Sequence, residues 1–455
     1  MPILSTNPAT GALIREYPET SPEAVTGALS LASRAAAEWA TTSFGERAAL
    51  MHKAGVRLRQ HTEDLAHLMA VEMGKPLAQG RAEAEKCAWV CDYYAEHSEG
   101  FLADQVVATD ASRSFITYRP LGVLLAVMPW NFPLWQVFRF AAPSLMAGNA
   151  VLLKHASNVS GCALAIEDVF LGVGFPPGIF RTILVGSNRV AGLIAAPEVK
   201  AVTVTGSTPA GRAVAAQAGA HLKKTVLELG GSDPYLILED ADLELAVESC
   251  VAARLINGGQ SCIAAKRFIV VDAVRKQFEE LLVEKMKAKR MGDPLEPGMD
   301  LGPQARRDLR DELHQQVARS RERGARLLLG GRVPEGSGAF YPPTVLTDVA
   351  RGQPAYDEEL FGPVAAVIGV KDEAEAIRVA NDTAFGLGAA VFTQDLARGE
   401  RIAATALDAG SCFVNGFVKS DPRLPFGGIK DSGYGRELSV LGIREFVNVK
   451  TVWVR

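Results

Sequence analysis

Short β-rich runs alternate with helical stretches along most of the 455-residue chain, and this alternation constrains the fold more than any other feature. One series follows Pro120, with β-rich runs at 123–127, 150–153, 183–185 and 201–205. A second follows Glu228, at 235–238, 267–271, 326–329, 389–392 and 410–414. Strands that alternate with helices form parallel sheets with crossover helices. We therefore expect two α/β domains in succession, since a chain of this length exceeds one hydrophobic core.

The two ends of the chain carry different patterns. Apolar residues recur three and four positions apart from Glu46 to Met73 and from Ala78 to Ser98, which predicts two amphipathic helices. The tail 446–454 is β-branched and alternating, with no neighbour in sequence to pair with. An exposed edge strand of this kind favours association unless another subunit covers it. The tail therefore predicts a homodimer or homotetramer.

Composition and charge exclude several function classes. The chain is 48% hydrophobic and 22% charged, with a net charge of −4 and no basic block, so neither nucleic acid nor membrane binding is expected. The first residues lack the features of a secretory signal, which predicts a cytoplasmic protein. Six scattered cysteines argue against a disulfide framework. Cys87 and Cys91 have no second ligand pair, so no metal site is expected.

Cys262 is the candidate nucleophile. It follows Asn257-Gly258-Gly259 at the end of a helical stretch, where glycines let the backbone present a side chain closely to a ligand. Such a cysteine on its own is more commonly a buried structural thiol. Glu228, between two leucines, should have a raised pKa and suits a general base. Asn131, between aromatics and prolines, could donate to an oxyanion. Together the three predict covalent catalysis.

The sequence lacks the usual glycine-rich motif for binding a dinucleotide cofactor. The chain has no G-x-G-x-x-G fingerprint in the right context, because Gly172 and Gly174 follow a helix and lie in a connecting loop. A better site is the strand 201–205, which runs into Gly206, Ser207 and a helical stretch whose N-terminus could bind a pyrophosphate. Lys154 ends another strand, where ligands bind in open α/β sheets.

Together these segments resemble the aldehyde dehydrogenase superfamily, in the family's order and along the whole chain. The resemblance rests on PWNFP, TGS, LELGG, GGQSC, EELFGP and PFGGIK. Details such as KHA and LGGSDP resemble the compact bacterial NAD(P)-dependent succinate-semialdehyde dehydrogenases. The family's fold implies a Rossmann-type cofactor domain, an α/β catalytic domain and a small β oligomerisation arm. The implied boundaries are 1–110 and 126–227 for the cofactor domain, 228–425 for the catalytic domain, and 111–125 and 430–455 for the arm.

The resemblance also implies residue roles. Cys262 would attack the aldehyde, its own N–H and Asn131 would stabilise the oxyanion, Glu228 would activate the hydrolytic water, and Glu437 would support proton transfer. Lys154 and Glu359 would hold ribose hydroxyls of NAD or NADP, and Ser207 would contact the pyrophosphate. The full implied cofactor set is Trp130, Lys154, Ser157, Thr205, Gly206, Ser207, Glu359 and Phe361. Many NAD-preferring members carry a glutamate where this chain has Ser157, so we expect NADP to be used.

Arg139 indicates the kind of aldehyde. It lies among aromatic residues, where an arginine is costly unless it meets an anion or another partner. It could bind a substrate carboxylate, as the matching arginine of succinate-semialdehyde dehydrogenases implies, or form a structural ion pair. Ser420 is a second candidate contact, and Trp135 and Phe426 would wall the pocket. The sequence therefore predicts oxidation of succinate semialdehyde to succinate.

Three alternatives remain. A dehydrogenase that passes the thioester to coenzyme A commonly lacks the general-base glutamate, which is present here as Glu228. A broad-specificity aldehyde dehydrogenase is separated from our prediction only by a panel of substrates. A non-catalytic structural protein on the same fold would have no reason to retain Cys262, Glu228 and Asn131 together.

Overall fold

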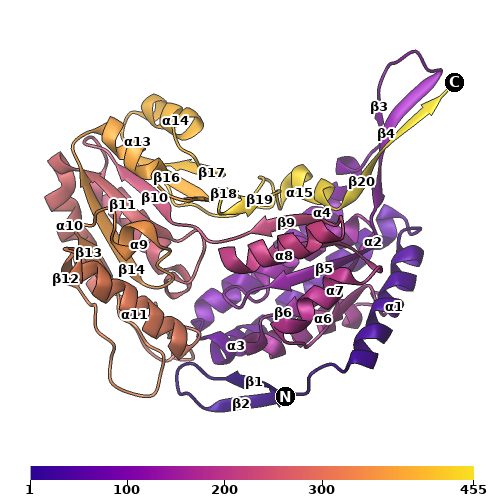
Figure 1. Ribbon diagram of the computed structural model, residues 1–455, viewed down its shortest axis with the longest axis horizontal. Helices are drawn as coiled ribbons and strands as arrows, with labels where there is room; N and C mark the ends of the chain where they lie inside the picture. The colour runs from indigo at the N-terminus through magenta and orange to yellow at the C-terminus, as the bar shows by residue number, and fades with distance from the viewer. Residues whose placement is uncertain (1) are drawn as a thin grey trace.

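Two parallel sheets organise the chain, and each forms the centre of one lobe (Figure 1). The computed structural model describes residues 2–455. The first sheet has the order β19-β9-β8-β5-β6-β7. Its strands are β5 (Val123–Met128), β6 (Ala150–His155), β7 (Phe180–Thr182), β8 (Val199–Thr205), β9 (Lys224–Glu228) and the antiparallel edge strand β19 (Gly433–Tyr434).

The second sheet has the order β12-β13-β14-β11-β10-β16-β17. All neighbouring strands in it are parallel except β12 and β13. Its strands are β10 (Asp233–Ile237), β11 (Ala265–Val271), β12 (Arg326–Leu329), β13 (Thr344–Thr347), β14 (Val364–Val370), β16 (Gly388–Phe392) and β17 (Ser411–Val414). Two small antiparallel pairs complete the strands outside the arm: β1 (Ile3–Thr6) with β2 (Leu13–Tyr17), and β15 (Phe385–Gly386) with β18 (Ile429–Lys430).

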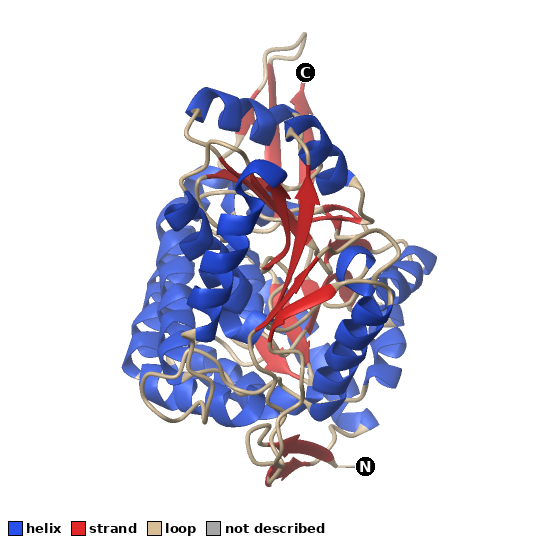
Figure 2. Ribbon diagram, turned by 90° about the vertical axis from the view of Figure 1, so that its left-hand side faces the viewer, coloured by secondary structure: helices blue, strands red, loops and turns tan. Residues whose placement is uncertain are grey.

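Helices lie on both sides of the strands (Figure 2). The first lobe contains α1 (Pro22–Trp39), α2 (Phe44–Gln60), α3 (Thr62–Met73), α4 (Leu77–Phe101), α5 (Trp135–Met146), α6 (Ser160–Gly172), α7 (Val190–Ala195), α8 (Thr208–Ala220) and α15 (Ser439–Glu445). The second contains α9 (Leu243–Leu255), α10 (Asp272–Lys287), α11 (Arg307–Glu322), α12 (Pro354–Asp357), α13 (Glu373–Asn381) and α14 (Leu396–Thr405). Short 3-10 turns occupy Ser157–Val159, Ser187–Arg189 and Ile256–Gly259.

The centre of the first sheet is fully apolar. β5 lies between β6 and β8 and is a continuous run of hydrophobic residues, as expected for a parallel strand covered on both faces. All twelve residues of α5 are buried, because this helix crosses the interior between α2, α4 and the sheet. A rigid core therefore supports the loop 129–134, which joins β5 to α5.

The strand order places a crevice beside that loop. Chain connections run from β5 to β6 and β7 on one side, and then return to β8 and β9 on the other. The order therefore reverses between β5 and β8, and ligands of open α/β sheets bind at the carboxyl ends of the strands where the order reverses. Asn131 follows β5, and Gly206 follows β8.

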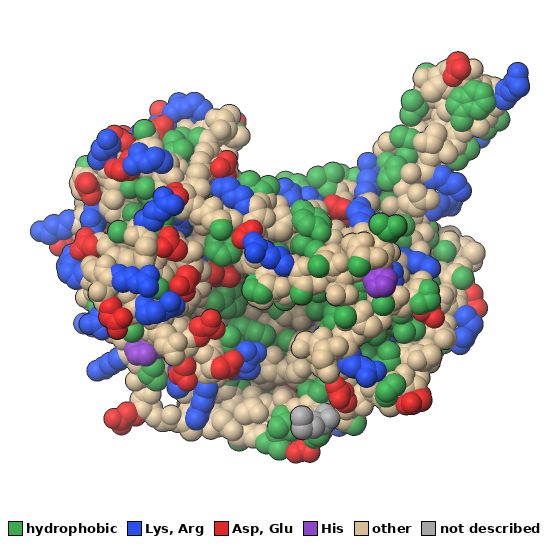
Figure 3. Space-filling view, viewed as in Figure 1, with side chains coloured by type: hydrophobic (Ala, Val, Ile, Leu, Met, Phe, Trp, Pro, Cys, Tyr) green, Lys and Arg blue, Asp and Glu red, His purple; other side chains and the backbone are tan. Residues whose placement is uncertain are grey.

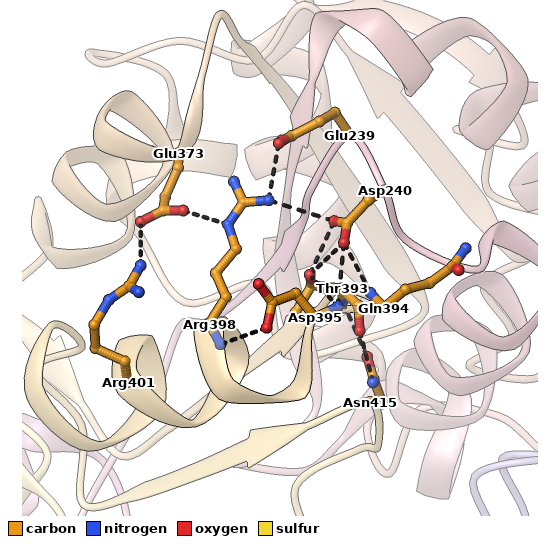
Figure 4. Close-up of polar contacts among 9 residues, drawn as sticks. All are labelled: Glu239, Asp240, Glu373, Thr393, Gln394, Asp395, Arg398, Arg401 and Asn415. Carbon is orange, nitrogen blue, oxygen red and sulfur yellow. Dashed lines mark hydrogen bonds and ion pairs between the residues drawn. The ribbon is translucent and has the colours of Figure 1, made fainter.

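An arginine-centred network ties helices of the second lobe to strand ends (Figure 4). Arg398 at the start of α14 contacts Glu239 after β10, at 2.8 Å, and Glu373 at the start of α13. Asp240 accepts hydrogen bonds from the hydroxyl of Thr393 and from backbone N–H groups that precede α14. These contacts lie away from both cavities described below and serve the fold.

The C-terminal tail forms an arm that projects from the first lobe (Figure 1). Strand β20 (Val447–Val454) pairs along its whole length with β4 (Arg113–Pro120), which also pairs with β3 (Gln105–Val106). The tail strand predicted from the sequence is present, and its partner comes from a distant part of the chain. β20 remains an edge strand, with Trp453 exposed.

Several segments differ from the sequence-based expectations. The helix expected over 46–73 is two helices, because the chain leaves the helical conformation at His61, whose φ is −105°. The strand expected at 183–185 was wrong by three residues, because the strand there is β7 at Phe180–Thr182, and β9, β13 and β14 were not predicted. Residues 123–125 belong to β5, and Gly433 pairs with Glu228 in the first sheet. The implied arm boundaries 111–125 and 430–455 are therefore too wide at both inner ends.

Residues 2–455 contain neither a membrane-spanning helix nor a cluster of side chains suited to a metal ion. No helix there combines the length and the apolar character that a membrane crossing requires. No group of three or more His, Cys, Asp or Glu side chains there is arranged to hold a metal ion.

Candidate active site

Two cavities meet at Cys262. One, of about 280 Å³, lies at the crevice between β5 and β8 and is bounded on the other side by α11. The second, of about 190 Å³, lies between α4, α5 and the segment 417–426. Cys262 and Gln136 line both cavities. Figure 3 shows a hollow between the two lobes with hydrophobic side chains on its inner surface.

The loop before Cys262 has a conformation that its sequence explains. Asn257, Gly258 and Gly259 all have positive φ values, of 54°, 63° and 76°. A Cβ atom at Gly259 would lie 2.2 Å from the carbonyl oxygen of Gly362, so only glycine fits there. The glycines therefore let the chain turn sharply out of α9 and present Cys262 to both cavities.

Lys266 holds this loop from behind. Its ammonium group is buried and donates to the carbonyl oxygens of Ser261 at 2.9 Å and Cys262 at 2.8 Å. The same group lies 3.3 Å from a carboxylate oxygen of Glu359, which accepts a 3.0 Å hydrogen bond from the N–H of Gly231. Lys266 thus joins the nucleophile loop to a residue of the first cavity.

Asn131 is fixed beside the nucleophile. Its side-chain Nδ2 donates to the carbonyl oxygen of Gln260 at 3.0 Å, and its own carbonyl oxygen accepts from Asn257 at 2.6 Å. One N–H of the Asn131 amide is therefore used to position the group, and the other is available to a ligand. This is the arrangement that an oxyanion donor requires.

Burial controls the ionisation of Cys262. Loss of solvent raises the pKa of the thiol to about 12, while the nearby charges of Arg139 and Lys266 lower it. The thiol is therefore protonated at neutral pH in this state. Attack on a carbonyl requires removal of that proton, so the site needs a base.

Glu228 is a buried carboxyl group at the end of β9, only 2% exposed, and neither of its oxygens has a hydrogen-bond partner. Burial holds its pKa well above the usual range, and the nearby Arg139 acts in the opposite direction. The apolar flanks of Glu228 predicted this direction. Glu228 does not line either cavity wall in this conformation. Its charge is close enough to raise the pKa of the Cys262 thiol.

Arg139 and Glu437 form a buried ion pair in the same interior. The guanidinium also stacks on the ring of Phe426, 4.7 Å from its centre. Phe426 and Glu437 exchange two backbone hydrogen bonds of 2.7 Å, so the C-terminal segment brings both partners to Arg139. Of the two roles considered for Arg139 in the sequence, the structural ion pair is present, and Arg139 also lines the second cavity.

We expect Arg139→Met to destabilise the protein strongly, because it leaves the Glu437 carboxylate buried without its partner. Such losses cost about 3–5 kcal/mol. The double variant Arg139→Met with Glu437→Gln should be more stable than the single variant, since it removes both charges. Midpoints of thermal unfolding test this. A double variant that melts below Arg139→Met would contradict the assigned pairing.

The first cavity suits a dinucleotide. Trp130, Thr205, Gly206, Ser207, Glu359 and Phe361 all line it. Thr205 and Gly206 lead into α8, whose N-cap is Ser207, so the N-terminal end of this helix lies at the cavity wall. A Cβ atom at Gly230 would lie 2.5 Å from Glu359, so glycine keeps this wall open. These residues fit the nicotinamide cofactor expected from the sequence.

Lys154 and Ser157 lie one strand away from that cavity. Lys154 is the penultimate residue of β6, opposite Val127 of β5, and its side chain has no ion pair or hydrogen bond within residues 2–455. Burial lowers its pKa, which makes an anionic partner favourable. Ser157 is exposed at the start of the next turn. Lys154 therefore offers a cation without a protein partner in the described residues, and Ser157 adds no competing negative charge.

The second cavity contains the four residues predicted to contact substrate: Trp135, Arg139, Ser420 and Phe426. Sequence reasoning missed Lys86, which lines the same cavity, and Lys266 and Gln136. Lys86 lies on a long helix with several other charged residues, and no local pattern distinguishes it. For Lys266, only its position four residues after Cys262 in the sequence could have indicated a role in the site.

Comparison with known proteins agrees with this geometry. The family described as "Aldehyde dehydrogenase family" matches residues 2–452. The chain is 50% identical over 454 residues to a probable succinate-semialdehyde dehydrogenase (NADP(+)) of Synechocystis sp., covering 100% of both chains. It is 48% identical over 450 residues to the succinate semialdehyde dehydrogenase (NAD(P)+) of Escherichia coli, covering 99% of this chain and 97% of that one.

Solved structures give the same result. The succinic semialdehyde dehydrogenase of Streptococcus pyogenes, in complex with NADP+ as the cofactor, superposes with a TM-score of 0.97 at 35% identity, covering 99% of each chain. The fold class and the family resemblance predicted from the sequence are therefore confirmed.

Proposed function

This chain belongs to the aldehyde dehydrogenase family, and from that premise we propose that it oxidises succinate semialdehyde to succinate with NADP+ or NAD+. The observation that carries the proposal is the small cavity that Cys262 shares with Arg139 and Ser420. It joins the nucleophile to polar and cationic groups suited to a short aldehyde with a carboxylate. The names of the full-length relatives support the same substrate.

In the first half of the reaction, the sulfur of Cys262 forms a bond to the aldehyde carbon, and the thiol proton leaves to a base. The carbonyl oxygen becomes an oxyanion, which the free N–H of Asn131 and the backbone N–H of Cys262 stabilise. When bound, NADP+ would accept the hydride that this carbon loses, and with it the two electrons of the oxidation. Cys262 is then left as a thioester with the acyl group.

In the second half, water attacks the thioester carbon. Glu228 accepts one proton from that water, the carbon–sulfur bond breaks, and the second proton of the water passes to the sulfur, so the Cys262 thiol is regenerated and the carboxylate is released. Glu437 lies beside Glu228 in the same buried cluster and would support movement of the proton away from the site. The presence of Glu228 favours water over coenzyme A as the acyl acceptor.

We propose that Trp130, Lys154, Ser157, Thr205, Gly206, Ser207, Glu359 and Phe361 bind the cofactor. Within residues 2–455, Lys154 has no protein anion to neutralise it, and a ribose 2′-phosphate would supply one. Ser157 places no negative charge beside that phosphate. Both observations favour NADP+.

Ser157→Glu is therefore expected to lower the ratio of kcat/KM for NADP+ to that for NAD+ by at least about tenfold, which corresponds to about 1.4 kcal/mol. A carboxylate near Lys154 would repel the 2′-phosphate and compete for the cation. Ser157→Gln is the matched control, since it adds similar bulk without charge. Equal ratios in the two variants would contradict this placement of the phosphate.

Steady-state kinetics with a panel of aldehydes test the proposed function. We expect kcat/KM for succinate semialdehyde to exceed that for butanal, which has the same chain length without the carboxylate, by at least about tenfold. Equal values for both aldehydes would favour a broad-specificity enzyme instead. Absence of nicotinamide reduction with every aldehyde would favour a non-catalytic protein.

The oligomeric state, the location in the cell and the domain boundaries are also proposals. We propose that the chain acts as a homodimer or homotetramer in the cytoplasm. The unpaired edge of β20, with Val449 and Trp453 exposed, offers a surface for a second copy. Residues up to 104 with 123–227 would form the cofactor domain and 228–425 the catalytic domain, with β3, β4 and β20 as the association arm.

A further inference from the structure

Lys86 projects from α4 into the cavity that holds Cys262. Its Nζ donates a 2.8 Å hydrogen bond to the hydroxyl of Ser420 and lies 4.3 Å from the centre of the Trp135 ring. Three elements therefore position this ammonium group: α4 carries it, α5 supplies the aromatic face, and the segment 417–426 supplies the hydroxyl. A long flexible side chain is thus held in one place beside the substrate cavity.

The charge of Lys86 has no carboxylate partner within residues 2–455. Glu83, on the same helix, is occupied by a buried ion pair with Lys75 and by the N–H groups of Leu134 and Trp135, at 2.9 and 3.0 Å. The other nearby carboxylate, Asp421, is engaged by the guanidinium and N–H of Arg423. Each acid near Lys86 is therefore already committed to another cation.

The two cations of the cavity differ in this respect. Glu437 forms an ion pair with Arg139, whereas no carboxylate within residues 2–455 forms one with Lys86, although Glu83 and Asp421 are near enough to raise its pKa. Burial and the neighbouring Arg139 charge lower the pKa of Lys86 to about 8, so the isolated cation is costly to keep charged. An anion that enters the cavity relieves this cost and gains a charge-assisted hydrogen bond.

We propose that Lys86, with Ser420, binds the carboxylate of the substrate and determines the preference for an acidic aldehyde. This inference rests on the proposed function and extends it, because it assigns the selection of the anion to Lys86 and gives the already paired Arg139 the secondary part. Lys86 is a specificity-determining residue that contacts the end of the substrate remote from the reacting carbon. Its loss should affect substrate binding more than the chemical step.

Lys86→Met tests the proposal, because it keeps most of the length and apolar stem of the side chain and removes the charge. We expect the ratio of kcat/KM for succinate semialdehyde to that for butanal to fall by at least about tenfold, mostly through KM. Lys86→Arg should retain most of the ratio. Lys276→Met, at an exposed position on α10 outside both cavities, is the matched control and should leave the ratio unchanged.

The pH dependence provides a second readout. As the pH rises through about 8, Lys86 loses its proton and the wild-type ratio of the two kcat/KM values should fall. Lys86→Arg should keep its ratio over the same range. The other titratable or charged groups around the cavity are Glu83 and Cys87 on α4, Arg139 on α5, Lys419 and Asp421 in the segment 417–426, and Cys262. Ionisation of Cys262 affects both aldehydes, so it cancels from the ratio.

The outcomes separate the two proposals. A wild-type enzyme that does not prefer succinate semialdehyde would contradict the proposed function. A wild-type enzyme that prefers it, together with a Lys86→Met variant of unchanged ratio or a wild-type ratio that stays flat through pH 8, would overturn the role of Lys86 alone. Turnover of butanal by Lys86→Met establishes that the variant is folded.

Discussion

Replacement of Cys262 by alanine is expected to lower kcat for aldehyde oxidation by at least about a thousandfold, because no other cysteine within residues 2–455 lines either cavity. The Cys262 side chain lines both cavities, and the positive φ values of residues 257–259 allow the loop to present it there. Cysteine and alanine differ little in volume, so the fold should be retained. Steady-state formation of NADPH with succinate semialdehyde measures the effect.

Cys412→Ala is the matched control. Cys412 lies on β17 and contacts neither cavity, so its removal should leave turnover close to that of the wild type. Binding of NADP+ to Cys262→Ala, followed by fluorescence, should persist because the cofactor residues are untouched. Substantial activity in Cys262→Ala would require a different nucleophile.

Glu228→Gln is expected to separate the two halves of the reaction. Loss of a positioned general base lowers a rate by about 10²–10⁴-fold, and here the affected step is hydrolysis of the thioester. Rapid mixing with succinate semialdehyde should therefore give a burst of about one NADPH per active site, followed by a much slower steady state. Loss of the burst together with the steady-state rate would mean that Glu228 is needed before the thioester forms.

The raised pKa of Glu228 gives this step a pH dependence of defined sign. A general base acts only when deprotonated, and burial moves its deprotonation to higher pH. The rate of thioester hydrolysis in the wild type should therefore increase with pH through the titration of Glu228. The Glu228→Gln variant should lack this limb. A wild-type rate that decreases over the same range would contradict the role of Glu228 as base.

The strands and the reacting residues could be predicted from the sequence because their signals are local. The apolar run of β5, the glycines before Cys262 and the leucines around Glu228 each report the environment of their own segment. The small-residue turn after β8 identified a helix N-terminus without the usual glycine fingerprint. From these local signals the sequence predicted residues that line the first cavity, and the cysteine that lines both cavities.

The remaining features depend on contacts between distant segments. Arg139 meets Glu437 only because the chain returns across α5 near its C-terminus, and Lys86 reaches the site from the middle of α4. The break between α2 and α3 at His61 leaves the apolar periodicity almost unchanged, so the pattern 46–73 gave no indication of it. Tertiary packing, and not local propensity, decides these features.

The central claim is that succinate semialdehyde becomes a succinyl thioester on Cys262. Mass spectrometry of Glu228→Gln, quenched in acid after brief incubation with succinate semialdehyde and NADP+, tests it most directly. We expect one succinyl group per active site, located by peptide mapping on the fragment that contains Cys262 and absent when NADP+ is omitted. An unmodified protein that has nevertheless reduced NADP+, or a succinyl group on any other residue, would contradict it.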